Sequence, residues 1–363
     1  MADLIQTIPL LISPFRTSDL SLNPFDRHLQ EAHNAIRMAL QQGFDHWLLT
    51  FSGGKDSTTT LVLALELALR ERLPVQRIDV VYADTLIEIP VLRQHALAFL
   101  DFLRKDDRFR SLPLFCHVVT PPLEERFWVC LLGKGYPPPH WKFRWCTKRL
   151  KVLPVKRHLE AYIRPNRTVI MTGVRFGESH QRDRQLRQTC SRGGECGQGV
   201  WFQYTPQLQV AYLAPIAHWR ECNVWDFLNF QAPAWGYPTR SLSRDVYNGQ
   251  DLRFGCWMCT VVRQDRTLAV LTAHAEHAHL RPLLEFRQYV IRTTAEEQSR
   301  YRRPNGTRGR LTLETRRQLL DRLLKLQEHT GLVLITPEEV AAIRALWEDP
   351  RYGEYPDRPI RDS

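Results

Sequence analysis

The segment that most constrains the fold is a short apolar run followed by a glycine-containing loop and a helical pattern. The apolar run covers residues 47–51, the loop reads Ser-Gly-Gly-Lys-Asp-Ser at 52–57, and helical spacing of apolar residues continues to residue 72. Glycines let the backbone turn sharply after a strand, so that N–H groups of the loop and of the first helical turn converge on an anion. The segment therefore predicts a phosphate-binding loop between a buried strand and a helix.

The rest of the first two thirds of the chain repeats this alternation of strand and helix. Further strands are predicted at 78–82, 115–119 and 169–172, with helices at 26–42 and 91–104. Such alternation favours a parallel sheet with helices on both faces. We therefore predict an α/β fold with a Rossmann-like, doubly wound parallel sheet. Residues 185–204 are rich in Gly, Arg, Cys and Gln without periodicity and are interpreted as a loop.

The character of the sequence changes after residue 263, where helical patterns dominate. Helices are predicted at 266–279, 281–299, 312–328 and 337–347, with a basic, turn-rich stretch at 301–310. Residues 281–325 hold 12 Lys and Arg against 5 Asp and Glu. We predict three units: a helical lead-in over 1–44, a nucleotide-binding domain with a cysteine site over 45–262, and a basic helical region over 263–363.

The net charge of the 363-residue chain narrows the classes of partner. It carries 50 Lys and Arg against 39 Asp and Glu, a formal charge of +11 at pH 7, which favours polyanionic partners. No apolar run approaches the roughly 18 residues of a membrane span. The first five residues lack the basic start of a signal peptide. We therefore expect a cytoplasmic protein without a membrane partner.

The glycine loop resembles the S-G-G-x-D-S motif of the PP-loop ATP pyrophosphatases, which have the adenine nucleotide α-hydrolase-like fold. A Walker A loop is excluded because Leu49 stands where that motif needs its first glycine. The segments 82–85 and 172–179 resemble the PAPS-reductase branch of the superfamily. The resemblance implies catalytic roles for Lys55, Asp56 and Arg175. It implies an ATP and Mg²⁺ site made by Ser52, Gly53, Gly54, Lys55, Asp56, Ser57, Asp84, Gly173, Arg175, Glu178 and Arg182, although a structural Arg175–Glu178 ion pair is the alternative.

The cysteines are too sparse for a disulfide scaffold and indicate a metal or redox site instead. The segment at 256–259 reads Cys-Trp-Met-Cys, whereas Cys116 and Cys130 are interpreted as core thiols and Cys222 as a structural residue at a helix start. The segments 145–151 and 255–260 resemble adenylyl-sulfate reductases, which bind a [4Fe–4S] cluster. This resemblance implies ligation by Cys146, Cys196, Cys256 and Cys259, with Cys190 as an alternative. Zinc held by Cys190, Cys196, Cys256 and Cys259 is the rival reading.

The segment 253–262 and the helical tail narrow the resemblance to the DndC and SspD-like sulfurtransferases of bacterial DNA phosphorothioation. This resemblance implies an ATP-dependent enzyme that adenylates a DNA backbone phosphate and releases pyrophosphate. Sulfur from a cysteine desulfurase would then replace AMP. It also implies duplex DNA and other phosphorothioation subunits as partners. The DNA phosphates would be contacted by Arg302, Arg303, Arg308 and Arg310.

Three other functions share part of this pattern. A nucleotide-sulfate (PAPS or adenylyl-sulfate) reductase is expected to need a nucleophilic cysteine near its C-terminus, and no cysteine follows Cys259. A tRNA thiolase shares the PP-loop but not the Cys-Trp-Met-Cys segment with its tail. A non-catalytic DNA-binding scaffold is disfavoured by the intact loop. The alternative to DNA binding by the basic tail is a solvated helical face or a protein-docking surface. Tyr289 and Tyr301 are interpreted as packing residues.

Overall fold

The central element of the protein is a six-stranded sheet that confirms the predicted α/β class. The computed structural model describes residues 23–177, 201–205, 208–247, 252, 254–262, 264–303 and 305–353. The strand order is β3-β2-β1-β4-β6-β5, and all pairs are parallel except the edge pair β5–β6. The strands are β1 (His46–Phe51), β2 (Arg77–Ala83), β3 (Leu114–Val119), β4 (Thr168–Met171), β5 (Trp201–Thr205) and β6 (Val210–Ala214).

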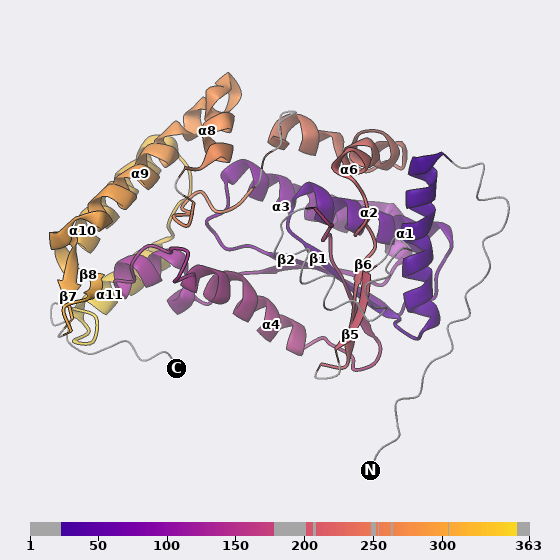
Figure 1. Ribbon diagram of the computed structural model, residues 1–363, viewed down its shortest axis with the longest axis horizontal. Coiled ribbons are helices and arrows are strands. Elements are labelled where there is room, and N and C mark those ends of the chain that lie inside the picture. Colours follow the sequence, from indigo (N-terminus) through magenta and orange to yellow (C-terminus); the bar gives the residue numbers. More distant parts are fainter. Residues whose placement is uncertain are drawn as a thin grey trace, which may run out of the picture.

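Helices cover both faces of this sheet, as a doubly wound fold requires (Figure 1). Helices α1, α2 and α3 lie on one face, and α4 lies on the other. Helix α2 is buried along most of its length, which explains its largely apolar sequence. The main helices are α1 (Pro24–Gln41), α2 (Lys55–Arg70), α3 (Pro90–Lys105), α4 (Leu153–Glu160), α6 (Glu221–Asp226), α8 (Arg266–Ala273), α9 (Arg281–Ala295), α10 (Leu313–Thr330) and α11 (Pro337–Glu348).

Shorter helical turns connect these elements. They are η2 (Asp107–Ser111), η3 (Leu123–Glu125), η4 (Val129–Gly133), η5 (Thr147–Val152), η6 (Phe227–Gln231), α7 (Ala232–Ala234), η7 (Leu242–Tyr247), η8 (Ala275–Leu280) and η9 (Glu297–Ser299). Several of them (η4, η5, η6 and η7) have the wide π-helical geometry, which is often found at functional sites.

The strand order creates a crevice at one defined place. The chain proceeds from β1 to β2 and β3 on one side of the sheet, whereas β4 and β6 lie on the other side of β1. The strand order therefore reverses between β1 and β4. Ligands of open α/β sheets bind in the crevice at this switch point. The glycine loop at residues 52–57 leaves β1 at this position, so the topology and the predicted phosphate loop coincide.

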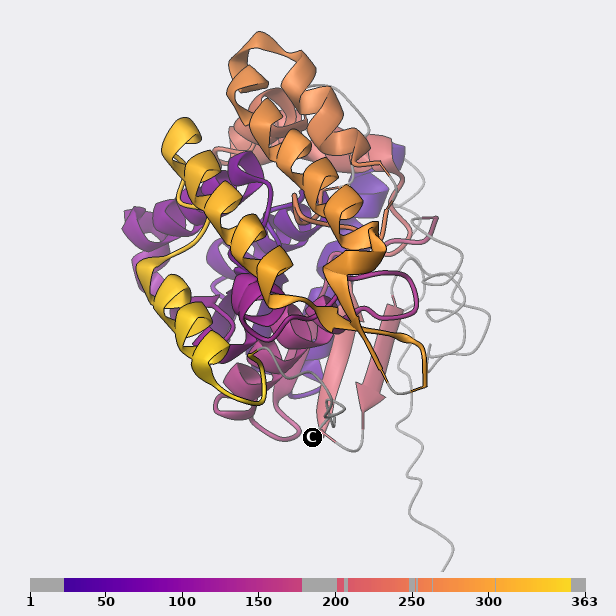
Figure 2. The same ribbon diagram turned by 90° about the vertical axis from the view of Figure 1, so that its left-hand side faces the viewer.

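The C-terminal helices pack on the segment between β3 and η5, and their core is continuous with that of the sheet (Figure 2). The indole of Trp128 donates to the Leu334 carbonyl at 2.8 Å, and the indole of Trp347 donates to the Leu132 carbonyl at 2.8 Å. The buried guanidinium of Arg316 donates to the Gly133 carbonyl at 2.7 Å. The basic tail is thus anchored by buried polar contacts as well as by apolar packing.

Two predictions of local structure were wrong. Residues 201–204, interpreted as part of a loop, belong to the edge strand β5, which pairs with β6. The turn-rich stretch at 301–310 contributes to a small hairpin of β7 (Arg300–Arg302) and β8 (Arg308–Leu311). The strands β5, β7 and β8 are all short, so the alternation of side chains along each strand is hard to recognise in the sequence. In the described part of the chain, no helix combines the length and apolar character needed to cross a membrane.

Candidate functional site

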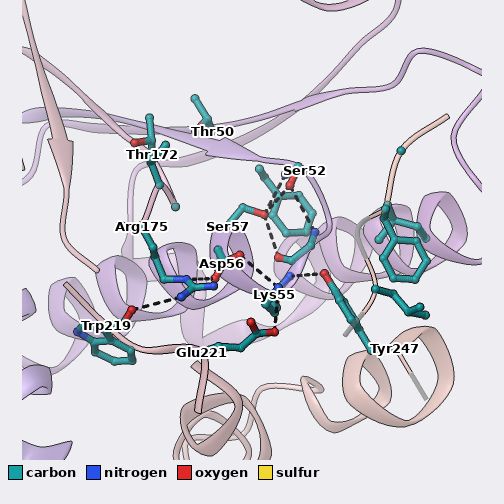
Figure 3. A pocket seen from close by; sticks show the side chains of 18 of the residues that line it. Thr50, Ser52, Lys55, Asp56, Ser57, Thr172, Arg175, Trp219, Glu221 and Tyr247 are labelled. Atoms are coloured by element: carbon teal, nitrogen blue, oxygen red, sulfur yellow. Dashed lines mark hydrogen bonds and ion pairs between the residues drawn. The ribbon is translucent and has the colours of Figure 1, made fainter. Parts of the chain in front are cut away.

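A cavity of about 1000 Å³ lies at the switch point of the sheet (Figure 3). Its walls come from the β1–α2 loop, the carboxyl end of β4, the start of α6, η7 and the segment just before Cys256. The lining residues are Thr50, Phe51, Ser52, Gly54, Lys55, Asp56, Ser57, Tyr82, Ala83, Glu88, Leu92, Lys151, Thr172, Gly173, Val174, Arg175, Phe176, Gly177, His218, Trp219, Arg220, Glu221, Tyr247, Leu252, Phe254 and Gly255. This volume lies in the range of small-molecule and cofactor sites.

The loop after β1 folds on itself through its two serines. The hydroxyls of Ser52 and Ser57 lie 2.9 Å apart, and the Ser57 hydroxyl donates to the Gly54 carbonyl at 3.0 Å. Gly53 has a φ of +75°, and a Cβ atom there would lie 2.7 Å from the Cβ of Ala96 on α3. Gly53 therefore supports the loop and is not among the lining residues, whereas the other five residues of the predicted loop line the cavity.

Gly173 brings the end of β4 against the first turn of α2. A Cβ atom at this position would lie 2.5 Å from the carbonyl carbon of Asp56 and 2.6 Å from the amide nitrogen of Ser57. Only a residue without a side chain allows the two backbones to approach so closely. The predicted involvement of Gly173 at the site therefore has a steric reason.

Lys55 is the centre of a charged cluster on one wall. Its ammonium lies 3.3 Å from the Glu221 carboxylate and 3.7 Å from the Asp56 carboxylate. Its amide N–H donates to the Tyr247 hydroxyl at 3.3 Å, and its ammonium lies 5.4 Å from the centre of the Tyr247 ring. Glu221 and Tyr247 were not singled out in the sequence, because they lie far along the chain in segments without a motif.

Arg175 faces the same point from the end of β4 and is only 6% exposed. Its Nε donates to Asp56 Oδ1 at 2.5 Å, and one terminal nitrogen donates to the Trp219 carbonyl at 3.3 Å (Figure 3). The structure thus brings together the three residues predicted to be catalytic, Lys55, Asp56 and Arg175. The alternative partner of Arg175, Glu178, lies outside the described residues, as does Arg182.

Asp84 does not take the place predicted for it. Its buried carboxylate accepts from the Arg93 guanidinium at 2.9 and 3.0 Å and from the Leu86 amide at 3.0 Å. These bonds direct it into the start of α3, and it is not among the lining residues of the cavity. Asp84 therefore holds the loop after β2 in place, and its role in the nucleotide site stays a prediction.

A second group of polar residues also lines the cavity. Glu88 accepts from the Thr85 hydroxyl at 2.6 Å, and its carboxylate lies 3.8 Å from the ammonium of Lys151. Burial raises the pKa of Glu88 above its ordinary value, and it outweighs the lowering effect of Lys151. The lining therefore includes this acid–base pair as well as the residues of the β1–α2 loop.

Cys256 and Cys259 lie beside the part of the cavity that Glu88 and Lys151 line. Cys256 forms a bridge with the backbone of Glu88, and its sulfur lies 3.9 Å from the Thr85 hydroxyl. The buried guanidinium of Arg287 on α9 donates to the Cys259 carbonyl at 2.7 and 3.0 Å. The C-terminal helices thus hold the cysteine segment against the sheet domain.

The predicted metal ligands do not form a complete set here. Cys146 lies within electrostatic range of Cys259, but among the described residues no three His, Cys, Asp or Glu side chains are arranged to hold a metal ion. Cys190 and Cys196 lie outside the described residues. The described thiols alone do not fit a [4Fe–4S] cluster or zinc, so the ligand set stays a prediction.

The remaining cysteines agree with their predicted places. Cys130 is fully buried, and burial raises its pKa to about 11. Cys116 lies in β3, where burial raises its pKa to about 11. Cys222 lies in the first turn of α6 and is exposed.

Three of the four arginines predicted to contact DNA are exposed. Arg302 pairs with the Glu297 carboxylate, and Arg308 donates to the Ala295 carbonyl at 3.1 Å. Arg303, in the turn between β7 and β8, is exposed as well. These three residues remain candidates for phosphate contacts, although two of them already have partners within the protein.

Arg310 has a structural place instead. It is only 7% exposed, and one terminal nitrogen donates to the Arg351 carbonyl at 2.5 Å. Its guanidinium lies 5.7 Å from the centre of the Tyr352 ring, and burial lowers its pKa below the ordinary value. These partners hold the Arg310 guanidinium away from solvent, and its contact with DNA stays a prediction.

Known proteins similar to this chain include two uncharacterized proteins of Methanocaldococcus jannaschii. The first is 26% identical over 62% of this chain and 44% of its own length, and the second is 26% identical over 58% and 35%. The chain thus matches less than half the length of either relative. A phosphoadenylyl-sulfate reductase of Candida auris aligns with 66% of this chain and 98% of its own, at 14% identity and a TM-score of 0.41.

An FMN adenylyltransferase of Candida glabrata aligns with 59% of this chain and 62% of its own, at 17% identity and a TM-score of 0.33. These TM-scores are too low to support a functional argument, and the fold assignment rests on the strand order described above. The comparison with protein families, in contrast, gives a clear assignment. Residues 46–262, more than half of the chain, match the phosphoadenosine phosphosulfate reductase domain, and the chain belongs to this family.

Proposed function

We propose that the protein is an ATP-dependent sulfurtransferase that adenylates a DNA backbone phosphate for sulfur insertion. The observation that carries the nucleotide-binding part is the convergence of the β1–α2 loop, Lys55 and Arg175 on one cavity at the switch point. The DNA acceptor and the sulfur donor rest on the resemblance of the tail and the cysteine segment to the phosphorothioation enzymes.

The loop and the first turn of α2 provide the donors for a triphosphate. The amides that follow Gly54 lie at the start of a helix of 16 residues, where the helix dipole favours negative charge. Arg175 and Lys55 are held near this point by Asp56 and Glu221. Phosphate oxygens would replace these carboxylates as partners of the two cations.

Mg²⁺ fits this arrangement, because magnesium in nucleotide sites needs only one or two carboxylates together with phosphate oxygens. Asp56 lines the cavity in the first turn of α2 and is the residue that would hold it. When bound, the ion would neutralise charge on the triphosphate. Arg175 would then be released from Asp56 to contact the phosphates.

The reaction would begin when a non-bridging oxygen of a DNA phosphate attacks the α-phosphorus of ATP. A new P–O bond forms, the bond to the β-phosphate breaks, and pyrophosphate leaves. A cysteine desulfurase supplies the sulfur as a persulfide, which a thiol would reduce by two electrons to sulfide, with a disulfide as the oxidised product. The sulfide would then attack the DNA phosphorus, the bond from that phosphorus to the adenylated oxygen would break, and AMP would leave with that oxygen. Positioning and charge stabilisation are the contributions of Lys55 and Arg175, since neither step needs a protein nucleophile.

A nucleotide-sulfate reductase is the second candidate, and the family match is also consistent with it. The same cavity would then hold the phosphates of a nucleotide sulfate. The two functions differ in their products. An adenylating enzyme converts ATP to AMP and pyrophosphate, whereas a reductase releases sulfite and does not cleave ATP.

The test uses anaerobically purified protein with ATP labelled at the α-phosphate, Mg²⁺, and either DNA or no DNA. AMP and pyrophosphate formed in a DNA-dependent reaction are expected. Asp56→Ala should lose this activity, whereas Asp101→Ala, a half-exposed carboxylate on α3, should retain it. Sulfite release from a nucleotide sulfate with a thiol reductant, without AMP formation from ATP, would replace this proposal with the reductase.

A further inference from the structure

A tight turn between η4 and η5 presents a tryptophan to solvent. The backbones of His140 and Phe143 pair, with N···O distances of 2.9 and 3.3 Å, so that Trp141 and Lys142 form the tip of the turn. Trp141 is 71% exposed, Phe143 is 38% exposed, and the Lys142 ammonium lies 4.8 Å from the centre of the Trp141 ring. Tryptophan is highly buried on average, so a ring exposed to this degree indicates a binding surface.

The turn is held firmly at its base. The Thr260 hydroxyl donates to the Pro139 carbonyl at 2.6 Å, and the indole of Trp145 donates to the Pro137 carbonyl at 3.0 Å. The Trp145 ring is buried and stacks on Phe127, with ring centres 5.4 Å apart. The exposure of Trp141 is therefore a feature of an anchored turn, and its ring is available without rearrangement of the backbone.

Positive charge surrounds this turn. Residues 142–157 contain seven Lys and Arg and no Asp or Glu. Lys142, Arg144 and Lys148 are exposed, and no ion pair joins any of the three to a carboxylate of the described residues. They differ in this respect from Arg302 of the tail, which pairs with Glu297. The turn thus combines an exposed aromatic ring with three cations that have no competing carboxylate in the described part of the chain.

The same segment leads into the cavity. Lys151 of η5 lines the cavity together with Gly255. Gly255 begins the cysteine segment, and Thr260, five residues later, is bonded to Pro139 at the base of the turn. Two chain segments therefore connect residues 140–151 to the wall of the cavity, one through Lys151 and one through Gly255.

We infer that residues 140–151 form the docking surface for an unpaired segment of DNA, the acceptor strand of the proposed reaction. The Trp141 ring stacks on one exposed base, and Lys142, Arg144 and Lys148 contact backbone phosphates. Lys151 receives the phosphate that enters the cavity. An unpaired strand fits better than a duplex because the face of Trp141 can stack only on a base that is not already stacked. The choice of DNA rests on the proposed function.

The first test measures binding of fluorescein-labelled 20-nucleotide DNA by fluorescence anisotropy, without ATP. Trp141→Ala should weaken the binding of single-stranded DNA by about tenfold, the effect of losing one stacked base. Phe230→Ala is the matched control, since Phe230 is 68% exposed on η6, and it should leave the Kd unchanged. The effect of Trp141→Ala should disappear on a strand of abasic sugars, which has phosphates but no bases to stack.

A second variant tests the electrostatic part. Lys148→Ala should reduce the slope of log Kd against log salt by about one, as expected for one lost phosphate contact. Lys105→Ala, an exposed lysine on α3, should leave the slope unchanged. An unchanged Kd for both Trp141→Ala and Lys148→Ala overturns the inference. Tighter binding of fully paired DNA, or of RNA of the same sequence, than of single-stranded DNA also overturns it.

The adenylation assay separates this inference from the proposed function. If wild-type protein forms no AMP but Trp141→Ala and Lys148→Ala weaken the binding of single-stranded DNA, the docking surface stands and the adenylation is wrong. If DNA stimulates AMP formation and Trp141→Ala lowers neither DNA binding nor stimulation, the proposed function stands and the docking surface is wrong.

Discussion

Gly173 and Asp56 approach each other so closely that a single methyl group on Gly173 would lie 2.5 Å from the carbonyl carbon of Asp56. This approach joins the end of β4 to the first turn of α2, and these are the two elements that flank the switch point of the sheet. Arg175, two residues after Gly173, thereby reaches Asp56 across a separation of 119 residues in sequence. The position of the Arg175 guanidinium therefore depends on the absence of a side chain at Gly173.

Gly173→Ala should separate the two elements. Because the clash is with backbone atoms of α2, it cannot be relieved by a side-chain rotation, and we expect a loss of about 1–3 kcal/mol in the free energy of unfolding. ATP affinity, measured by calorimetry, should fall as well. Gly255→Ala is the control, since a Cβ there meets nothing within 4 Å. Equal stability of both variants would show that the approach of β4 to α2 is not required.

The ion pair of Arg175 and Asp56 should contribute more to the free energy of unfolding than an ion pair on the surface does. Removing one partner leaves a poorly hydrated charge, so Asp56→Ala and Arg175→Met should each lower the free energy of unfolding by about 3 kcal/mol. The double variant removes both charges and should lose less than the sum. Urea unfolding of the four proteins gives the coupling energy. Additive losses would contradict a direct interaction.

Asp79 is predicted to make the stability depend on pH through a network on the other end of the sheet. Burial raises its pKa, but hydrogen bonds from His46, Arg77 and His117 outweigh burial and hold it well below its usual value of 3.8. Because the pKa of Asp79 is lower in the folded state, Asp79 stabilises that state at pH values above its pKa in the unfolded chain. This stabilisation is lost as the pH falls towards its pKa in the folded protein.

The corresponding measurement compares the wild type with Asp79→Asn by urea unfolding. The difference in the free energy of unfolding should be about 3 kcal/mol at pH 7 and should shrink below about pH 4. Asp101→Asn provides the control, because its exposed pair with Lys105 should contribute less than about 1 kcal/mol. A difference between wild type and Asp79→Asn that stays constant from pH 7 to pH 3 would rule out this role.

The sequence predicted the fold and the nucleotide-facing loop because both depend on local patterns. The apolar run before Ser52 and the glycines after it determine strand, turn and helix within about 25 residues. Glu221 and Tyr247 contact Lys55 only because of the course that the chain takes between β6 and η7. No local sequence pattern predicts that course.

The surroundings of two predicted site residues could not be foreseen for the same reason. Asp84 was assigned from its place after β2, but its direction is decided by Arg93 on the following helix. Arg310 was counted with the exposed basic residues of the tail, although the packing of the tail buries it against Tyr352. Composition indicates that a segment is basic, whereas tertiary packing decides which of its guanidinium groups face solvent.

The thiols should differ in reactivity according to their surroundings. Burial, together with the nearby Glu88 carboxylate, raises the pKa of Cys256 well above its ordinary value, which disfavours the reactive thiolate. In metal-free protein treated with iodoacetamide, Cys222 on the surface of α6 should be alkylated first, and Cys256 and Cys130 should stay protected until the protein unfolds. Mass spectrometry of tryptic peptides after timed labelling gives the three rates. Labelling of Cys256 as fast as that of Cys222 would show that the cysteine segment does not pack against Thr85 and Glu88 as described.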